Sequence, residues 1–412
     1  MLKIKAGALQ LTLFISVVIA LLLGAFILYI KLQDRIQKQH YFVQETINNA
    51  QKGIEYGLIN KLTINDSIFV LDNDDESIKV KSSYWGMLTK ITSKATIKNF
   101  SFKKVAFIGT QKDSEKNIVL QLADYNKPLV LVGKTNIQGN ALLPKQGVKP
   151  GNIAGVPFYG ANLIDGRISV GNQLPEFSLE RKKYFNSIFS VPQAESDFID
   201  LDTNRKWKNS FNNETKVIYS NSAIQLEAVD LLGNIKIQSA TKITIKESAN
   251  LKDILVVAPT IEIKENVVGT FQAIASKEII VDKDVKLGYP SALVVSENNK
   301  EENKSSIQIS NGVEINGAVV YLGKGKASNY DSQIYLDTDS KIIGEVYCNK
   351  NLELLGSVYG RVYTANFITR QSGSIYQNHI YNGTILIDKL PNEYVGLSFA
   401  KNTNKSLVKW LY

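Results

Sequence analysis

Residues 341–364 read KIIGEVYCNKNLELLGSVYGRVYT, and this stretch indicates the fold of the body. A glycine followed by an apolar β run occurs at Gly344 and again sixteen residues later at Gly360. Between them, apolar residues lie two apart, which is the period of a strand with one buried face. Glycine can form a tight corner that other residues resist. Strand, corner and strand at a regular interval predict the stacked turns of a β-solenoid.

The same pattern extends over residues 223–395, which we assign to the solenoid. Short β runs recur there at 235–237, 243–245, 261–263, 278–281, 307–309, 334–336 and 352–354. Ile261 and Ile279 are eighteen residues apart, and so are Ile334 and Leu352. We therefore predict that one apolar side chain per turn stacks into a core ladder. The predicted ladder consists of Ile261, Ile279, Ile309, Ile334 and Leu352.

Outside the solenoid the chain divides into further segments. Residues 61–128 carry short β runs ended by turn residues and predict a β-rich connecting domain. Residues 129–173 are rich in glycine and resemble the solenoid segment in their spacing of glycine and short β runs, so they predict a further β or solenoid segment. Residues 174–222 are polar and predict an irregular insertion. Residues 396–412 are expected to be a C-terminal cap or tail, because the open end of a solenoid must be covered.

The N-terminal segment has a different character. No charged residue occurs from Ala6 to Ile30, and the nearly continuous apolar run from Leu11 would span about 30 Å as a helix, the thickness of a bilayer core. Apolar residues then recur three and four apart up to Leu58, so residues 8–60 predict one transmembrane plus amphipathic helix. A secretory signal peptide and a buried core helix are the alternatives. The predicted membrane anchor is formed by Leu11, Phe14, Val18, Leu22, Phe26 and Ile30.

Together these segments predict the fold class. It is mainly β, with a long N-terminal transmembrane α-helix followed by a β-solenoid body that resembles a parallel β-helix. The helix is expected to lie half in lipid and half against the soluble body.

The N-terminus resembles that of type IV pilins and minor pseudopilins. The shared features are a short basic leader at residues 1–7, an apolar stretch beginning ALQLTLFISVVIALLLGAFIL, and a second half ending NAQKGIEYGL. The resemblance implies cleavage by a prepilin peptidase between Gly7 and Ala8 and a place in a filament or secretion apparatus. In that family the fifth residue of the mature chain is usually a glutamate, whereas here it is Thr12.

The stretch at 341–364 also resembles bactofilins, which are polymer-forming β-helical cytoskeletal proteins. The likeness extends loosely over residues 230–390. It implies a β-helical architecture and a tendency to self-associate.

Composition excludes several classes of protein. The chain has 412 residues, 44% hydrophobic and 21% charged, as in globular proteins rather than disordered or many-pass membrane proteins. Its net charge of +9 comes from lysines spread along the sequence, so we expect no nucleic-acid partner. The one cysteine, Cys348, and the two histidines, His40 and His379, offer no thiolate metal cluster and no histidine triad. We therefore predict no catalytic residue, no cofactor and no metal ligand.

One pattern favours an enzyme. Asp282 with Asp284, and Asp337 with Asp339, each place two carboxylates two residues apart, as on one side of a strand. Glycoside hydrolysis uses such pairs of carboxylates. No basic or histidine partner repeats beside them, so a carbohydrate-active β-helix is the less favoured alternative.

The sequence predicts a non-enzymatic, membrane-anchored structural or interaction protein of the cell envelope. Its partners would be the lipid bilayer and other envelope or filament proteins, including further copies of itself. The basic residues on the two sides of the span balance, so orientation follows the pilin resemblance: a single pass through the bacterial cytoplasmic membrane, with the bulk of the chain extracytoplasmic. The alternative is a membrane-tethered, bactofilin-like polymerising scaffold that faces the cytoplasm.

Overall fold

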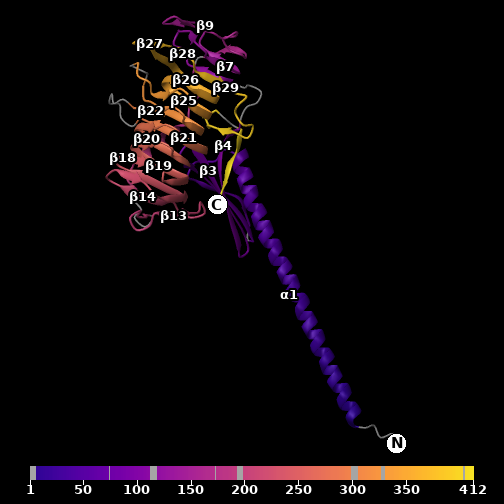
Figure 1. Cartoon of the computed structure of the whole chain (residues 1–412). Helices are drawn as coiled ribbons and strands as arrows, with labels where there is room; N and C mark the ends of the chain where they lie inside the picture. Colours follow the sequence, from indigo (N-terminus) through magenta and orange to yellow (C-terminus); the bar gives the residue numbers. More distant parts are fainter. Residues whose placement is uncertain are drawn as a thin grey trace. The chain divides into compact units, whose positions relative to one another are not determined.

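The computed structural model describes residues 6–73, 75–111, 118–171, 173–192, 198–297, 305–325, 330–401 and 404–412. It is mainly β and has one long N-terminal helix, as predicted (Figure 1). The chain divides into two compact units. The first contains the residues up to Tyr56 with Ser67–Val80 and Ser93–Lys104; the second contains Gly57–Asp66, Lys81–Thr92 and Val105–Tyr412.

The first unit is built on the helix α1 (Ala6–Ile59), which is 54 residues and therefore about 81 Å long. The single helix predicted over residues 8–60 is confirmed. It continues without a break because it contains no proline. Its C-terminal part packs against the sheet, where Ala50 and Ile54 are fully buried. Gly53 permits this close approach, since a Cβ there would lie 2.1 Å from the Ser93 Oγ. The sheet consists of β1 (Ser67–Asp72), β2 (Glu76–Trp85), β3 (Leu88–Ile97) and β4 (Phe100–Gln111), and the last three continue into the second unit.

The second unit is dominated by parallel strand pairing between successive turns of the chain, around a common interior. Three ladders run through it, and the longest strands take part in more than one. Ladder one consists of β13 (Lys206–Asn209), β16 (Asp230–Gly233), β19 (Asn250–Ile263), β20 (Val268–Val281), β21 (Lys286–Ser296), β23 (Glu314–Leu322), β25 (Lys341–Leu354), β26 (Ser357–Gln371), β29 (Thr384–Leu386) and β7 (Asn136–Gln138).

The other two ladders share the central strands. Ladder two consists of β14 (Lys216–Ser220), β17 (Ile235–Ser239), β19, β20, β21, β23, β25, β26, β5 (Ile118–Leu122), β8 (Asn140–Leu143) and β12 (Ile168–Val170). Ladder three consists of β15 (Ile224–Leu226), β18 (Lys242–Ile245), β19, β20, β22 (Ser306–Ile309), β24 (Ile334–Leu336), β25 and β26.

Smaller elements complete the second unit. A parallel sheet joins β28 (His379–Tyr381), β6 (Leu129–Val132) and β9 (Val148–Pro150). β27 (Ser374–Gln377) pairs with β26, and β10 (Asn152–Ile153) with β11 (Val156–Pro157), both antiparallel. The remaining elements are the helix α2 (Leu179–Ser187) and the strands β30 (Val395–Gly396) and β31 (Lys405–Leu411).

The predicted core row is present in ladder three, with one change. Ile261 pairs with Ile279, which continues through Ile307 and Ile334 to Leu352, and all five are fully buried. Ile309 was expected in this row, but it lies two residues further along, where it pairs with Val281 and Leu336. Both positions point inward because the side-chain period of a strand is two.

A column of glycines lies on a corner of these turns. Gly317 pairs with Gly344, and Gly344 with Gly360, as the sixteen-residue spacing of the last two suggested. All three have positive φ, between 147° and 153°. A Cβ on Gly344 would lie 1.8 Å from the carbonyl oxygen of Gly317, so only glycine lets the turns stack this closely here.

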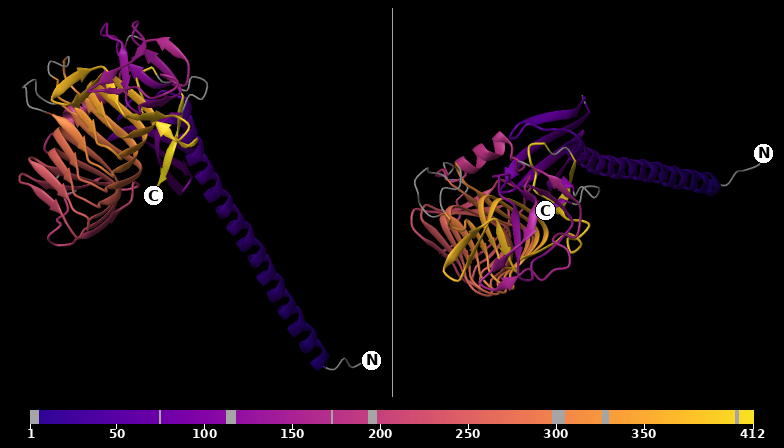
Figure 2. Two further views of the ribbon diagram at one scale, coloured as in Figure 1. Left: turned by 45° about the horizontal axis from the view of Figure 1, so that its top comes forward. Right: turned by 90° about the horizontal axis from the view of Figure 1, so that it is seen from above.

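The spatial order of the turns differs from their order in the sequence. The turns stack from β13 to β26, and the earlier segment containing β5, β7, β8 and β12 continues the stack beyond them (Figures 1 and 2). Residues 174–222, expected to be an irregular insertion, contain α2 and the ladder strands β13 and β14. Both strands are short, and the exposed Lys206 and Lys208 at alternate positions of β13 hide its apolar face in the sequence.

The expected cap also has a different place. β31, within residues 396–412, forms an antiparallel strand on β4 instead of covering the end of the stack. The seven residues of β31 can hydrogen-bond with the free backbone groups at the edge of β4. This pairing provides more backbone hydrogen bonds than a contact with the end of the stacked turns would. At the first turn, three partly buried apolar residues pack against the core: Ile199, Leu201 and Trp207.

Candidate functional site

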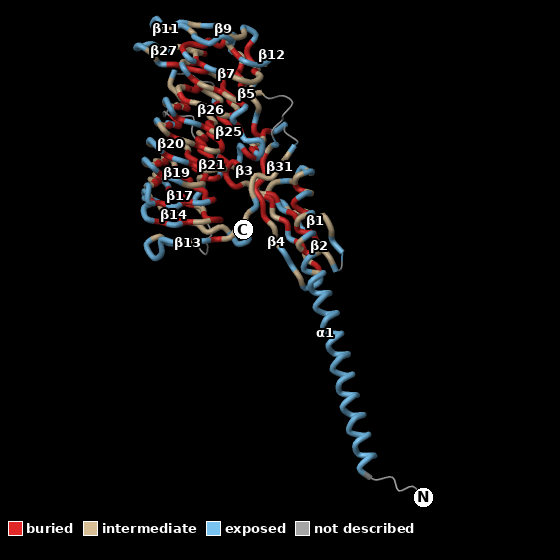
Figure 3. The backbone as a smooth tube through the Cα atoms, turned by 45° about the vertical axis from the view of Figure 1, so that its right-hand side comes forward, coloured by how far each residue is buried: buried red, intermediate tan, exposed pale blue. Residues whose placement is uncertain are grey.

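The N-terminal half of α1 is an apolar surface without a partner among the described residues. Each of the six predicted anchor residues is exposed, from 37% at Val18 to 66% at Phe14 (Figure 3). The helix is long and apolar enough to cross a membrane, with a mean hydropathy of 2.9 in its most apolar window and none of that window buried. A signal sequence would have the same properties. The six residues, listed along the helix, are Leu11, Phe14, Val18, Leu22, Phe26 and Ile30.

The polar side chains in the apolar stretch are satisfied by the helix itself. Thr12 Oγ1 donates a hydrogen bond to the Leu9 carbonyl at 2.9 Å, and Ser16 Oγ donates to the Thr12 carbonyl at 2.8 Å. Such backbone pairing removes most of the cost of placing a hydroxyl in lipid. Thr12 therefore fits an apolar environment, although it cannot supply the charge of a glutamate.

The predicted cleavage site lies at the start of α1. Gly7 and Ala8 are both helical, and among the described residues no atom beyond the adjoining helix backbone lies within 4 Å of the position that a Gly7 Cβ would occupy. Residues 1–5 of the predicted leader lie outside the described residues. Cleavage between Gly7 and Ala8 stays a prediction.

The outer face of ladder two carries a second hydrophobic core within the second unit. Apolar side chains that point outward from its strands are covered by α2, the β2–β3 turn and the C-terminal segment. The rings of Phe177, Tyr347 and Phe399 form a mutually packed triangle: the Phe177 centroid lies 5.0 Å from that of Tyr347 and 4.9 Å from that of Phe399, and the latter two lie 5.7 Å apart. The outer face of ladder two is therefore closed to solvent here. In the sequence, such burial is indicated by strands with apolar residues on both faces.

A buried ion pair lies at the edge of this second core. Glu345 is 2% exposed, and its carboxylate accepts a 2.5 Å hydrogen bond from the Leu397 N–H and contacts Arg361 at 3.5 Å. Burial raises the pKa of Glu345, and Arg361 opposes this effect. The pair fastens the segment around Leu397 to β25, so its role is structural.

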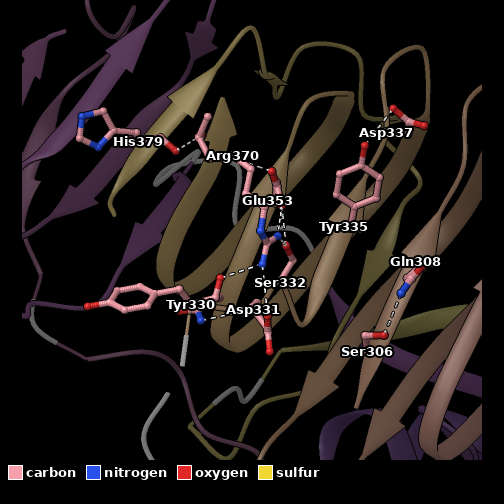
Figure 4. Close-up of polar contacts among 12 residues, drawn as sticks. Ser306, Gln308, Tyr330, Asp331, Ser332, Tyr335, Asp337, Glu353, Arg370 and His379 are labelled. Atoms are coloured by element: carbon pink, nitrogen blue, oxygen red, sulfur yellow. Dashed lines mark hydrogen bonds and ion pairs between the residues drawn. The ribbon is translucent and has the colours of Figure 1, made fainter. Parts of the chain in front are cut away.

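A polar cluster on the third ladder is centred on Arg370 (Figure 4). Its guanidinium donates to Glu353 Oε2 at 2.7 Å, to Ser332 Oγ at 2.5 Å and to the Tyr330 carbonyl at 2.9 Å. Asp331 Oδ1 lies 3.4 Å from the same group. These bonds compensate the charges within the cluster and fasten residues 330–332 to β25 and β26. No spacing in the sequence marks these residues as neighbours.

The C-terminal strand is held by a second ion pair. Lys409 Nζ donates to both carboxylate oxygens of Asp253 at 2.7 Å, and the Asp253 side chain is 1% exposed. The Phe211 N–H donates to the carbonyl of Tyr412 at 2.6 Å. β31 is thus held by backbone pairing with β4 and by the Lys409–Asp253 ion pair with β19 of the stacked turns.

The aspartate pairs and the cysteine considered for chemistry lie in turns and in the buried core. Asp282, Asp284, Asp337 and Asp339 lie in turns after β20 and β24 rather than on one side of a strand. Burial raises the pKa of the Cys348 thiol to about 12, so it is protonated at neutral pH. Within the described part of the chain, no group of three or more histidine, cysteine or acidic side chains could hold a metal ion.

No protein-family model matches the chain, and no curated protein matches it. Among solved structures, the chain is similar to the competence-associated pilin ComZ from Thermus thermophilus, at 8% identity, over 90% of this chain and 96% of that one, with a TM-score of 0.23. That TM-score does not establish a common fold. The bactofilin resemblance has no counterpart in these comparisons and stays a prediction.

Proposed function

We propose that this chain is a non-catalytic structural and interaction protein of the bacterial cell envelope, anchored in the cytoplasmic membrane by α1. The observation that carries the proposal is the division of α1: its N-terminal half exposes mostly apolar side chains, whereas its C-terminal part is packed against β-strands. Burying one large apolar side chain is worth about 1.5–3 kcal/mol, so the six anchor residues together favour a nonaqueous partner by about 10 kcal/mol. A bilayer supplies that partner.

Beyond the span, α1 offers a surface to other proteins. Leu32, Ile36 and Val43 are exposed and lie four and seven residues apart, which places them on one face of the helix. This stripe supports helix-to-helix contact with another envelope or filament protein, or with a second copy. A pilin-like or pseudopilin-like component, as the N-terminal sequence suggests, would use its helix in this way.

We infer that the second unit is a β-solenoid that presents a rigid surface outside the cytoplasm. The inference is supported by the three parallel ladders and by the inward row from Ile261 to Leu352. Stacked turns bury a continuous core and resist bending, as a scaffold requires. The ion pairs formed by Glu345, Arg370 and Lys409 fasten segments of the chain to one another. This use of its buried charges supports a role without catalysis.

The anchor is tested by replacing Leu21 and Leu22 with arginine in the full chain. Each central arginine costs about 2.5–3.5 kcal/mol on insertion, so the variant should leave the carbonate-washed membrane fraction. Leu32→Arg is the control, because Leu32 is exposed on the same helix just beyond the apolar stretch and should not change the partition. Retention of the double variant at the level of the parent chain would refute the anchor.

A further inference from the structure

The outer face of ladder two is left uncovered at one corner, where it forms a groove of about 570 Å³ within the second unit. The floor consists of outward-facing residues from successive turns. Ser296 pairs with Leu322 in the strand register. Asn349, Ala365 and Ala123 each come one residue after a paired residue: Cys348 pairs with Tyr321 and with Thr364, and Thr364 pairs with Leu122. The floor residues are Ser296, Leu322, Asn349, Ala365 and Ala123. At about 4.8 Å per strand, this floor is about 19 Å long.

One wall of the groove is rigid. It is formed by α2 and the segment before it, and it contributes Gln173, Glu176, Lys182 and Asn186. Lys236 Nζ donates to the carbonyl of Ile188 at 3.0 Å and so holds the C-terminal end of α2. This binding surface therefore exists before any ligand arrives.

The opposite end of α2 is also fastened. Arg181, buried to 3% exposure, donates to the carbonyl of Met87 at 2.7 Å and to that of Gly86 at 3.2 Å. Its guanidinium lies 4.2 Å from the centre of the Tyr84 ring. With both ends fixed, the wall side chains keep a constant spacing above the floor.

The acidic side chains of the groove have partners within the protein. Glu176 pairs with Lys182 at 3.0 Å, and Glu297 pairs with Lys350 at 2.9 Å and accepts a hydrogen bond from the Lys324 N–H at 2.7 Å. Asp124 accepts from the N–H groups of Asn126 and Lys145. The three carboxylates are therefore already engaged by lysine ammonium groups or by backbone N–H groups.

Two uncharged polar side chains of the wall are free to bind. The side chains of Gln173 and Asn186 are exposed and make no hydrogen bond with any other described residue. An amide both donates and accepts, as a sugar hydroxyl does. Tyr125, 43% exposed, stands at the β5 end of the groove and offers a flat apolar ring.

We propose that this groove binds a neutral oligosaccharide of about four sugar units. Its length fits such a chain, its polar groups match hydroxyls, and its floor of small and uncharged residues leaves room for the rings. An extended peptide fits less well, because the backbone groups of the floor strands already pair with one another in the ladder. The site does not depend on how α1 is anchored.

The test uses the full chain in lipid nanodiscs, since maltoside detergents carry a sugar headgroup. Binding by calorimetry is measured for maltotetraose, the tetramer of N-acetylglucosamine, tetragalacturonate and tetra-alanine. We expect a neutral tetrasaccharide to bind with a Kd of about 1 mM or below. Gln173→Ala and Asn186→Ala should each weaken it about tenfold. Gln308→Ala is the matched control, because Gln308 is exposed on ladder three, and it should leave the Kd unchanged.

Each binding result either supports or contradicts a neutral-oligosaccharide site. Binding of neutral tetrasaccharides that both groove variants weaken and the control does not supports the proposal. Binding of tetragalacturonate or tetra-alanine alone contradicts it, as does binding that neither groove variant changes, or no binding of either neutral probe. All three substituted residues are exposed, so folding is not expected to change, and equal melting temperatures check this.

Discussion

Replacing Ile279 with alanine tests whether the inward row holds the stacked turns together. Ile279 is fully buried, with Ile261 on the turn before it and Ile307 on the turn after it. Removing its outer carbons leaves a cavity between two fixed turns, so the free energy of unfolding should fall by about 3–4 kcal/mol, within the range for buried isoleucine. Ile280 is the matched control: it is the next residue, it points outward, and Ile280→Ala should cost about 1 kcal/mol or less.

The assay is urea denaturation of the full chain in nanodiscs, followed by tryptophan fluorescence. Trp207 packs against the core that contains Ile279, so its emission reports on the second unit. The two variants should differ roughly a hundredfold in folding equilibrium constant, with unchanged slopes against urea. Equal costs for Ile279→Ala and Ile280→Ala, or a larger cost for Ile280→Ala, would refute the register, because a slip of one residue exchanges the two faces.

Three further changes have defined outcomes. Gly7→Leu should block cleavage before Ala8, which intact-mass measurement detects as retention of the seven-residue leader; a parent chain that always begins at Met1 contradicts the predicted cleavage. Asp253→Asn should destabilise the second unit by about 2–3 kcal/mol, because it leaves the half-buried Lys409 ammonium without its partner; no change in the urea midpoint contradicts that role. Burial lowers the pKa of Lys236 to about 8, so the unfolded chain binds one more proton between pH 8 and about 10.5 and stability should rise with pH there; Lys236→Met should remove about 2 kcal/mol of that rise between pH 7.5 and 10, and an unchanged pH profile contradicts it.

The interior of the stacked turns was largely predictable because it is a local pattern repeated along the chain. The eighteen-residue steps from Ile261 to Ile279 and from Ile334 to Leu352 correspond to observed partners. Ile309 was placed in the wrong row because two inward residues on one strand have the same chemistry. The long helix was predictable for the same reason, since its apolar stretch needs no distant partner.

The long-range arrangement was not predictable from one sequence. The return of β5 to stack on β26, and the pairing of β31 with β4, join residues far apart in the chain, and neither run differs in composition from other short strands. The ion pairs share this property: Lys409 meets Asp253 only because β31 lies beside the stacked turns. The groove on ladder two depends on where α2 packs, and α2 is too short and too polar to be recognised from its periodicity.

The location of the C-terminus tests the proposal that α1 anchors the chain in the membrane with its body outside the cytoplasm. A reporter that is active only outside the cytoplasmic membrane, fused after Tyr412, should be active in cells and should stay with the carbonate-washed membranes. Protease added to spheroplasts should then digest the body. An inactive external reporter together with an active cytoplasmic one at the same position, and a protected body, would contradict the claim and favour a scaffold that faces the cytoplasm.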